Sequence, residues 1–257
     1  MITQRFSVEA ETASVRYSVV VDAWRSIYRG SLDVADFGSP RQLAVIRSQA
    51  YSIATGYLER ERGEIARISA EIAERARESA LEELGSIDAR ALPEAASDHL
   101  SVTEQHLANE IAIQIERDIG ALQQAVRRTA LQVGIAAQSR GVSRRAALLQ
   151  YRLGNPGELE FYFKDRRNQK FPAQKFIRSV WRHHLLSLYN EVTLLTLADH
   201  GEIAAQVRHV NPSSEFDSTI IAMSSGSQHP IYVEVRDAIF HPNADAVLGR
   251  VRSDVHS

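Results

Sequence analysis

The chain has 257 residues, 44% of them hydrophobic, and a formal net charge of −2. This length and composition predict a globular protein with a sizeable core, and the charge gives no overall attraction to nucleic acid, since nonspecific DNA binders carry a clear basic excess. The absence of cysteine excludes disulfides, thiol nucleophiles and cysteine-based zinc sites.

The N-terminus lacks the basic start and the long apolar run of a signal peptide. No stretch of about 18 apolar residues occurs anywhere in the chain. We therefore expect a protein that is not exported by that route and that has no membrane partner.

The first 150 residues predict helix almost throughout. Ser39 and Pro40 form a helix start, because a serine can cap the first turn and a proline is tolerated within it. Two long helices are predicted, at about 41–84 and 98–139. Each is amphipathic and must bury its apolar side, so the pair is expected to form an antiparallel hairpin or part of a bundle.

Each of these helices carries one apolar stripe and one charged face. The charged face of the first, including Glu61 and the adjacent pair Glu82 and Glu83, is expected to be solvated. The stripes consist of Leu58, Ile65, Ile68, Ile72, Ala76 and Leu84 on the first helix, and of Leu107, Ile111, Ile115, Ile119, Leu122, Val126 and Val133 on the second.

A turn at 154–157, rich in glycine and proline, marks the expected domain boundary. A short helix, 144–153, precedes it. The predicted division is a helical region, 1–154, and a C-terminal α+β domain, 155–257. The fold class is therefore predominantly helical α+β, with a long N-terminal helical hairpin or bundle.

Beyond this turn the period of the pattern changes. Apolar and polar residues alternate over 159–164, as in a half-buried strand, and the polar segment 165–169 predicts a tight reversal. A helix is expected from about Pro172 to His200, ended by Gly201. Short β-prone runs in the tail predict a small sheet, and they are 203–210, 220–223, 231–235 and 247–251.

Three signals recur in a fixed order in the last hundred residues: ELEFYFKDRRNQKFPAQKFIRSV at 158–180, LYNEVTLLTLADHGE at 188–202 and IFHPNADAVLGRV at 239–251. Together they resemble the C-terminal region of the Mu F-like minor head proteins of tailed bacteriophages. The resemblance covers about 155–255. Its motif positions, which we expect to organise the C-terminal fold, are Asp165, Arg178, Asn190, Gly201, His241, Pro242 and Asn243.

The resemblance implies a non-enzymatic virion protein, present in low copy number and associated with the portal, the major capsid protein or other head proteins. It further implies a role in head assembly and in DNA packaging or release. Such a protein is made in the host cytoplasm and ends inside the capsid. Homo-oligomerisation is left open. Members of the family often carry cysteine pairs in the tail, and this chain has none, so its tail must fold through hydrophobic and backbone contacts.

His241, Pro242 and Asn243 also have a plain structural interpretation. Proline fixes φ, asparagine readily forms a turn, and histidine can hydrogen-bond across it. The histidines, which include His183 and His184, show neither H-x-x-x-H nor H-E-x-x-H spacing. We therefore expect no metal site and no cofactor.

A local basic run offers the one candidate DNA contact. Aromatic residues interleave with it, and a nonspecific contact with packaged genome is the predicted use, although the aromatics also fit the inward face of a strand. Arg178 and Arg182 extend the run along the following helix. The candidate DNA-contacting residues are Lys164, Arg166, Arg167, Lys170 and Lys175.

Two alternatives remain. Arg178, Ser179 and Glu191 occur in the order found in ADP-ribosyltransferases, which favours a virion-associated effector enzyme on the same scaffold. All three fall on one predicted helix, whereas that chemistry needs separate strands around a cofactor, and no glycine-rich phosphate loop is present. The other alternative is a helical adaptor or nonspecific DNA-binding module.

Overall fold

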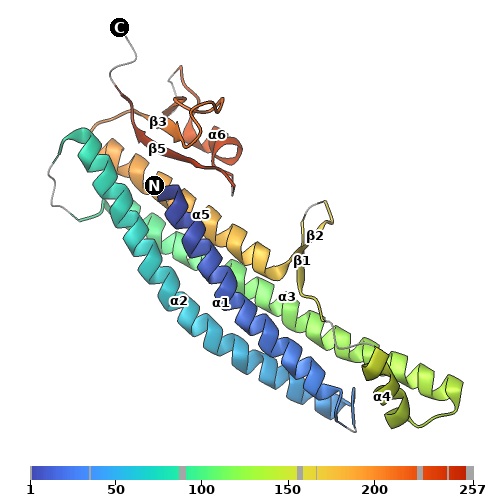
Figure 1. Ribbon diagram of the computed structural model, residues 1–257. Coiled ribbons are helices and arrows are strands. Elements are labelled where there is room, and N and C mark those ends of the chain that lie inside the picture. The colour runs from blue at the N-terminus through green and yellow to red at the C-terminus, as the bar shows by residue number, and fades with distance from the viewer. Residues whose placement is uncertain are drawn as a thin grey trace. The chain divides into compact units, whose positions relative to one another are not determined.

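The computed structural model describes residues 2–34, 36–86, 91–154, 159–165, 167–224, 228–241 and 243–252. Helices dominate these residues (Figure 1), which confirms the predominantly helical α+β class. The helices are α1 (Ile2–Ser31), α2 (Pro40–Leu84), α3 (Glu94–Arg140), α4 (Arg144–Gly154), α5 (Ala173–Asp199) and α6 (Tyr232–Ile239). The strands are β1 (Tyr162–Lys164), β2 (Lys170–Pro172), β3 (Ala204–His209), β4 (Ile220–Ala222) and β5 (Ala246–Arg250).

The contacts of the chain group into two compact units. The sheet unit comprises Met1–Ala13, Arg62–Asn109 and Arg178–Ser257, and the hairpin unit comprises Ser14–Glu61 and Glu110–Ile177. Both units draw on residues before and after the expected boundary at 154/155. The turn proposed as that boundary falls largely on 155–158, outside the described residues, and the division into 1–154 and 155–257 stays a prediction.

Helix α2 begins and ends where the sequence indicates, whereas α3 begins at Glu94, before the predicted start at about 98. The hydroxyl of Ser39 accepts the backbone N–H of Gln42 at 3.1 Å, which caps the start of α2. At its end, Gly85 takes a φ of +67°, and the N–H of Ser86 donates to the carbonyl of Leu81 at 3.0 Å. A left-handed glycine is the usual way to close a helix, because it has no Cβ to clash.

The apolar stripes form the core of each unit. In the hairpin unit, Ile111, Ile115 and Ile119 of α3 are at most 1% exposed. The indole N–H of Trp24 on α1 donates to the carbonyl of Ala50 on α2 at 3.2 Å. In the sheet unit, Ile65, Ile68, Ile72 and Ala76 of α2 are buried, with Leu107 of α3. The predicted stripes are therefore confirmed as core, apart from the half-buried ends Leu58 and Leu84.

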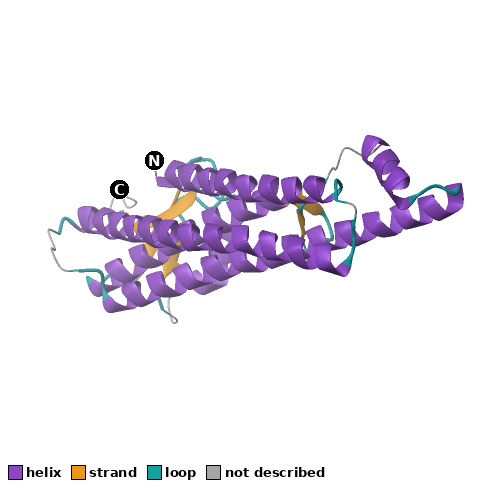
Figure 2. Ribbon diagram, turned by 90° about the horizontal axis from the view of Figure 1, so that it is seen from below, coloured by secondary structure: helices purple, strands orange, loops and turns teal. Residues whose placement is uncertain are grey.

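A small antiparallel sheet of the order β4-β3-β5 lies in the sheet unit, and strands occupy only short parts of the chain (Figure 2). Ala205 of β3 pairs with Ile221 of β4 and with Arg250 of β5. Three of the four expected β-prone runs supply these strands. The small sheet predicted for the tail is thus present.

The fourth run was wrongly predicted, because 231–235 begins a helix. Tyr232, Ile239 and Phe240 are buried, and their spacing of seven and eight residues places them on one helical face. Val233, which favours a strand by propensity, is 69% exposed. Burial of the aromatic face outweighs the weak β-propensity of the two valines.

Among the described residues, no helix combines the length and the apolar character needed to cross a membrane.

Candidate nucleic-acid interface

Strands β1 and β2 form a short hairpin in the hairpin unit, which we call the hairpin arm (162–172). Phe163 pairs with Phe171 and Lys164 with Lys170. Opposite residues of antiparallel strands share a face. Lys164 of β1 therefore lies beside Lys170 of β2.

Asp165 builds the turn of the arm. Its Oδ1 accepts the backbone N–H of Arg167 at 2.9 Å and that of Gln169 at 2.8 Å. Asn168 takes a φ of +60°, a conformation that asparagine tolerates better than most residues. Asp165 therefore holds the reversal expected from the sequence, whereas Arg166 lies outside the described residues.

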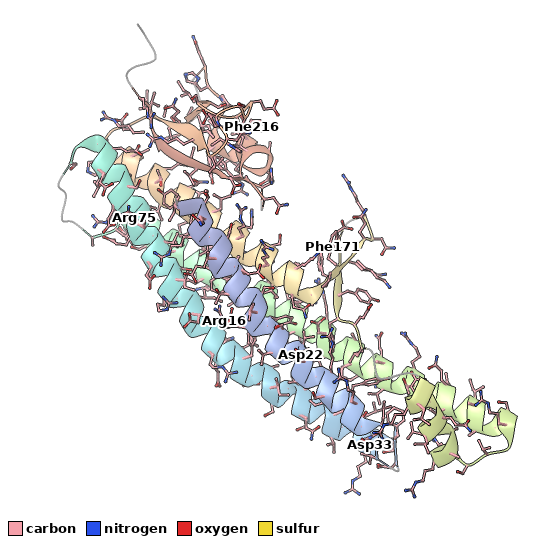
Figure 3. The ribbon with its side chains drawn as sticks, in the orientation of Figure 1. Arg16, Asp22, Asp33, Arg75, Phe171 and Phe216 are labelled. Atoms are coloured by element: carbon pink, nitrogen blue, oxygen red, sulfur yellow. The ribbon has the colours of Figure 1, made fainter. Side chains whose placement is uncertain are left out.

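The aromatic residues of the arm divide between an inner and an outer role. Phe163 stacks on Phe176 of α5 with ring centroids 4.4 Å apart, and the guanidinium of Arg117 lies 5.6 Å from the centre of its ring. Tyr162 and Phe171, the latter labelled in Figure 3, are 39% and 38% exposed. The alternation in the sequence thus correctly separated Phe163 from Tyr162, whereas Phe171, which pairs with Phe163 and shares its face, is partly exposed.

Four candidate cations are exposed on and next to the arm, and they are Lys164, Arg167, Lys170 and Lys175. The ammonium of Lys170 lies 4.5 Å from the centre of the Tyr162 ring, which is a cation–π distance. Exposed cations beside exposed aromatic rings can contact phosphates and stack on bases. This chemistry matches nonspecific nucleic-acid binding.

The basic run does not continue along α5 as the sequence indicated. Arg178 belongs to the sheet unit and pairs with Glu11 at 3.1 Å. Arg182 is only 8% exposed, and its guanidinium donates to Asp245 at 2.5 Å and to the carbonyl of Ala244 at 2.9 Å. The extension to Arg182 was wrong, because a carboxylate and a carbonyl distant in the sequence occupy its donors.

Two other motif positions hold the backbone of the sheet unit. The fully buried Asn190 of α5 accepts the N–H of Leu248 of β5 at 2.9 Å. Gly201 has a φ of +83°, and the N–H of Glu202 donates to the carbonyl of Leu197 at 3.1 Å, which ends α5. Asn190 binds the main chain of a strand, and Gly201 shapes the main chain at the end of a helix.

The His241 segment forms a turn. The Nδ1 of His241 accepts the N–H of Asn243 at 3.2 Å, and its carbonyl accepts the N–H of Ala244 at 2.8 Å. This is the hydrogen bond across the turn that the sequence predicted. Pro242 lies outside the described residues.

Sequence reasoning missed an ion-pair cluster around Glu83. Its carboxylate binds the guanidinium of Arg208 at 2.8 Å and accepts the N–H of Arg250 at 2.6 Å. Arg250 also pairs with Glu202 at 2.7 Å. A Cβ added at Gly249 would lie 2.6 Å from Cζ of Arg208, so a larger residue fits there only if the Arg208 side chain moves. The prediction of a solvated Glu83 was wrong, because its partners come from strands far along the chain.

A second missed cluster lies in the hairpin unit. Glu61, expected to be solvated, is 1% exposed and binds Arg16 of α1, which is labelled in Figure 3, through two hydrogen bonds of 2.8 and 2.9 Å. The next residue of α1, Tyr17, donates to Asp118 at 2.6 Å, and Gln114 donates to the same carboxylate at 2.9 Å. Burial raises the pKa of Asp118 to about 7, against the opposing effect of these two donors.

The residues of the enzyme alternative lie on one helix, as the sequence predicted. Arg178, Ser179 and Glu191 all belong to α5. Burial raises the pKa of Glu191, while the positive charge of Arg236 opposes the rise. The described part of the chain holds no group of three or more histidine and acidic side chains arranged for a metal ion.

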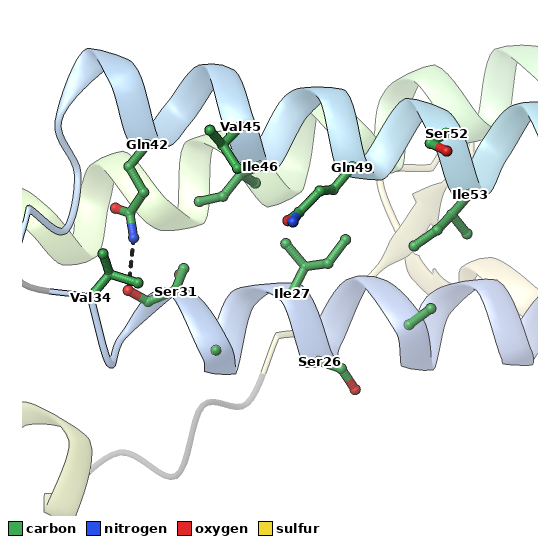
Figure 4. A pocket seen from close by; sticks show the side chains of 12 residues that line it. Ser26, Ile27, Ser31, Val34, Gln42, Val45, Ile46, Gln49, Ser52 and Ile53 are labelled. Atoms are coloured by element: carbon green, nitrogen blue, oxygen red, sulfur yellow. Dashed lines mark hydrogen bonds between the residues drawn. The ribbon is translucent and has the colours of Figure 1, made fainter.

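An uncharged pocket of about 740 Å³ lies between α1 and α2 in the hairpin unit (Figure 4). Apolar and small side chains line it, including Ile27, Val45 and Ile53. At one end, Gln42 donates to the carbonyl of Ser31 at 2.9 Å. Because no charged residue lines it, this pocket suits neither phosphate binding nor acid–base chemistry. The hairpin arm, in contrast, carries exposed cations that suit phosphate.

No family model matches the sequence, and neither a curated protein nor a solved structure matches it.

Proposed function

We propose that this protein is a non-enzymatic structural component of a tailed-phage particle, a minor head protein that acts inside the capsid in head assembly and in DNA packaging or release. The proposal is based on the structural roles of the motif residues. Asp165, Asn190, Gly201 and His241 each bind or terminate main chain. Residues used in this way specify a scaffold, as the resemblance to the Mu F-like minor head proteins implies.

The hairpin arm supports a contact with DNA within that role. Its cations and aromatic rings are exposed, while the chain as a whole has a formal charge of −2. A protein of this charge binds DNA only through a local patch. The proposed contact is sequence-independent, because cations and stacked rings read phosphates and base faces rather than base edges.

The protein partners proposed are the portal, the major capsid protein or other head proteins, and they rest on the resemblance alone. In this proposal, the role of Arg178 is structural, through its ion pair with Glu11. The effector-enzyme alternative has no observation of its own beyond the residue order on α5.

Protease protection in purified particles tests the proposed location. Particles from the strain that encodes the chain are treated with protease, either intact or after the heads have been opened, and the chain is then detected by an antibody. We expect full-length chain in intact particles and digestion only after opening. Digestion in intact particles would contradict an interior position, and absence from particles would contradict the virion role.

A further inference from the structure

A pocket of about 280 Å³ in the sheet unit brings four histidines together. His99 and His106 come from α3, seven residues apart and therefore on one face of that helix. His183 and His184 come from α5, with ring centroids 5.8 Å apart. The short helix α6 and the residue that follows it line the pocket with Tyr232, Arg236, Asp237 and Phe240.

The pocket combines four imidazoles with one permanently charged cation, Arg236, and one acid, Asp237. Burial lowers the pKa of the His99 imidazole, and the charge of Arg236 and the neighbouring His106 lower it further. The Nε2 atom of His99 is buried and has no hydrogen-bond partner among the described residues. A buried imidazole nitrogen without a partner is costly, and a ligand that accepted its proton would remove that cost.

Two acidic groups interact with Arg236. The side chain of Asp237 lines the pocket, is 90% exposed and lies 3.5 Å from Arg236. Glu191 of α5 is half-buried beyond Tyr232 and does not line the pocket. Tyr232 is buried and uncharged, because burial raises its pKa far above neutrality, and the field of Glu191 adds to the rise.

We propose that this pocket binds a phosphate group, held by the Arg236 guanidinium and by imidazole N–H donors of His99 and His106. A guanidinium is a good partner for a tetrahedral oxyanion, since its fork of donors matches two oxygens at once. The volume suffices for a phosphate with bound water, since one water takes up about 30 Å³ in the liquid. A metal ion is not favoured, because these histidines do not form a ligand set among the described residues.

Binding of an anion and protonation of His99 must favour each other. A phosphate beside the imidazole stabilises its charged form, so the pKa of His99 rises on binding, and by linkage the affinity for phosphate rises as the pH falls. Arg236 supplies the charge that does not titrate. Occupancy therefore depends on pH through the imidazoles that face Arg236.

NMR of the imidazole Cε1–H groups of the full chain tests the proposal. Inorganic phosphate is titrated at constant ionic strength at about pH 6 and about pH 8. We expect saturable shifts at His99 and an upward shift of its pKa on binding, a readout of the imidazole that is separate from the second ionisation of the phosphate itself. Arg236→Gln is expected to weaken binding about tenfold. Arg75→Gln is the matched control, because Arg75 is also half-exposed and pairs with an acidic neighbour, Glu78.

A second titration with oligothymidylate separates the sources of the phosphate. Shifts of His99 at lower concentration than with inorganic phosphate would assign the pocket to a nucleic-acid backbone, and shifts with inorganic phosphate alone would assign it to free phosphate. Either result supports the proposal. Equal, unsaturable shifts at all histidines, or equal effects of the Arg236 and Arg75 variants, would overturn it.

Discussion

The side chain of Asn190 on α5 accepts the backbone N–H of Leu248 on β5 at 2.9 Å, at a position with no solvent exposure. This bond is the only role the structure gives the Asn190 Oδ1 among the described residues. It explains why a fully buried position of α5 carries an asparagine. The bond ties the sheet to α5 without involving any reactive group.

Replacement of Asn190 by alanine should destabilise the sheet unit. The N–H of Leu248 would lose its acceptor inside the fold, which costs roughly 1–3 kcal/mol. The free energy of unfolding, measured with urea, checks this value. Asn109→Ala is the control, because Asn109 is exposed. An equal effect of the two substitutions would show that the buried bond contributes nothing.

Gly249→Ala should disturb the cluster around Glu83. The added Cβ would lie 2.6 Å from Cζ of Arg208 and 2.9 Å from Oε2 of Glu83, so the ion pair must move. We expect a loss of about 1–3 kcal/mol in unfolding free energy. Gly120→Ala in α3 meets no atom within 4 Å and should stabilise by roughly 0.5–1 kcal/mol. Two changes of the same sign would contradict this account.

Asp118 should make the stability of the hairpin unit depend on pH. Its folded-state pKa of about 7 lies above the ordinary value, so the protonated form is favoured in the folded state. Stability is then highest at acidic pH, falls as the pH rises from about 4 to about 7, and stays level above that range, with a total loss of roughly 4 kcal/mol.

Urea unfolding of the Asp118→Asn variant between about pH 5 and about pH 8 measures this dependence. The variant should lose that part of the pH dependence and should be more stable than the natural chain at the higher pH. Asp98→Asn, at an exposed position, is the control. If the two variants gave the same pH profile, the buried carboxyl would not be the cause.

The sequence predicted the helical part of the fold well, because its signals are local. Ser39, Pro40 and Gly85 mark the ends of α2, and the alternation around Phe163 marks the first strand of the arm. Helix α6 could not be predicted from propensity, since Val233 and Val235 favour a strand. Burial of its apolar face within the sheet unit favours the helix instead.

The candidate site was only partly predictable, for a physical reason. The exposed cations of the arm follow from composition. Arg182 does not join them, because it binds Asp245, 63 residues later in the chain. The pairs of Glu83 with Arg208 and of Glu61 with Arg16 join residues 125 and 45 positions apart. A helical pattern shows which face is charged, and it does not show which charge meets a distant partner.

The hairpin arm should account for the salt dependence of DNA binding. Replacement of Lys164, Arg167 and Lys170 by glutamine removes three phosphate contacts, so the slope of log affinity against log salt should fall by about 2 to 3 for duplex DNA. Fluorescence anisotropy measures the slope. The control replaces Arg41, Arg60 and Arg62, which are exposed on α2, and removes the same charge. The same slope for both triple variants would exclude the arm as the contact.

The most direct test of the central claim counts the chain in purified particles. Gradient-purified, DNA-filled particles from the encoding strain are analysed by quantitative mass spectrometry, for the natural chain and for the two triple variants. We predict a low, constant copy number for all three, with a smaller fraction of DNA-filled particles for the arm variant alone. Absence of the natural chain from these particles would contradict a structural role in the head.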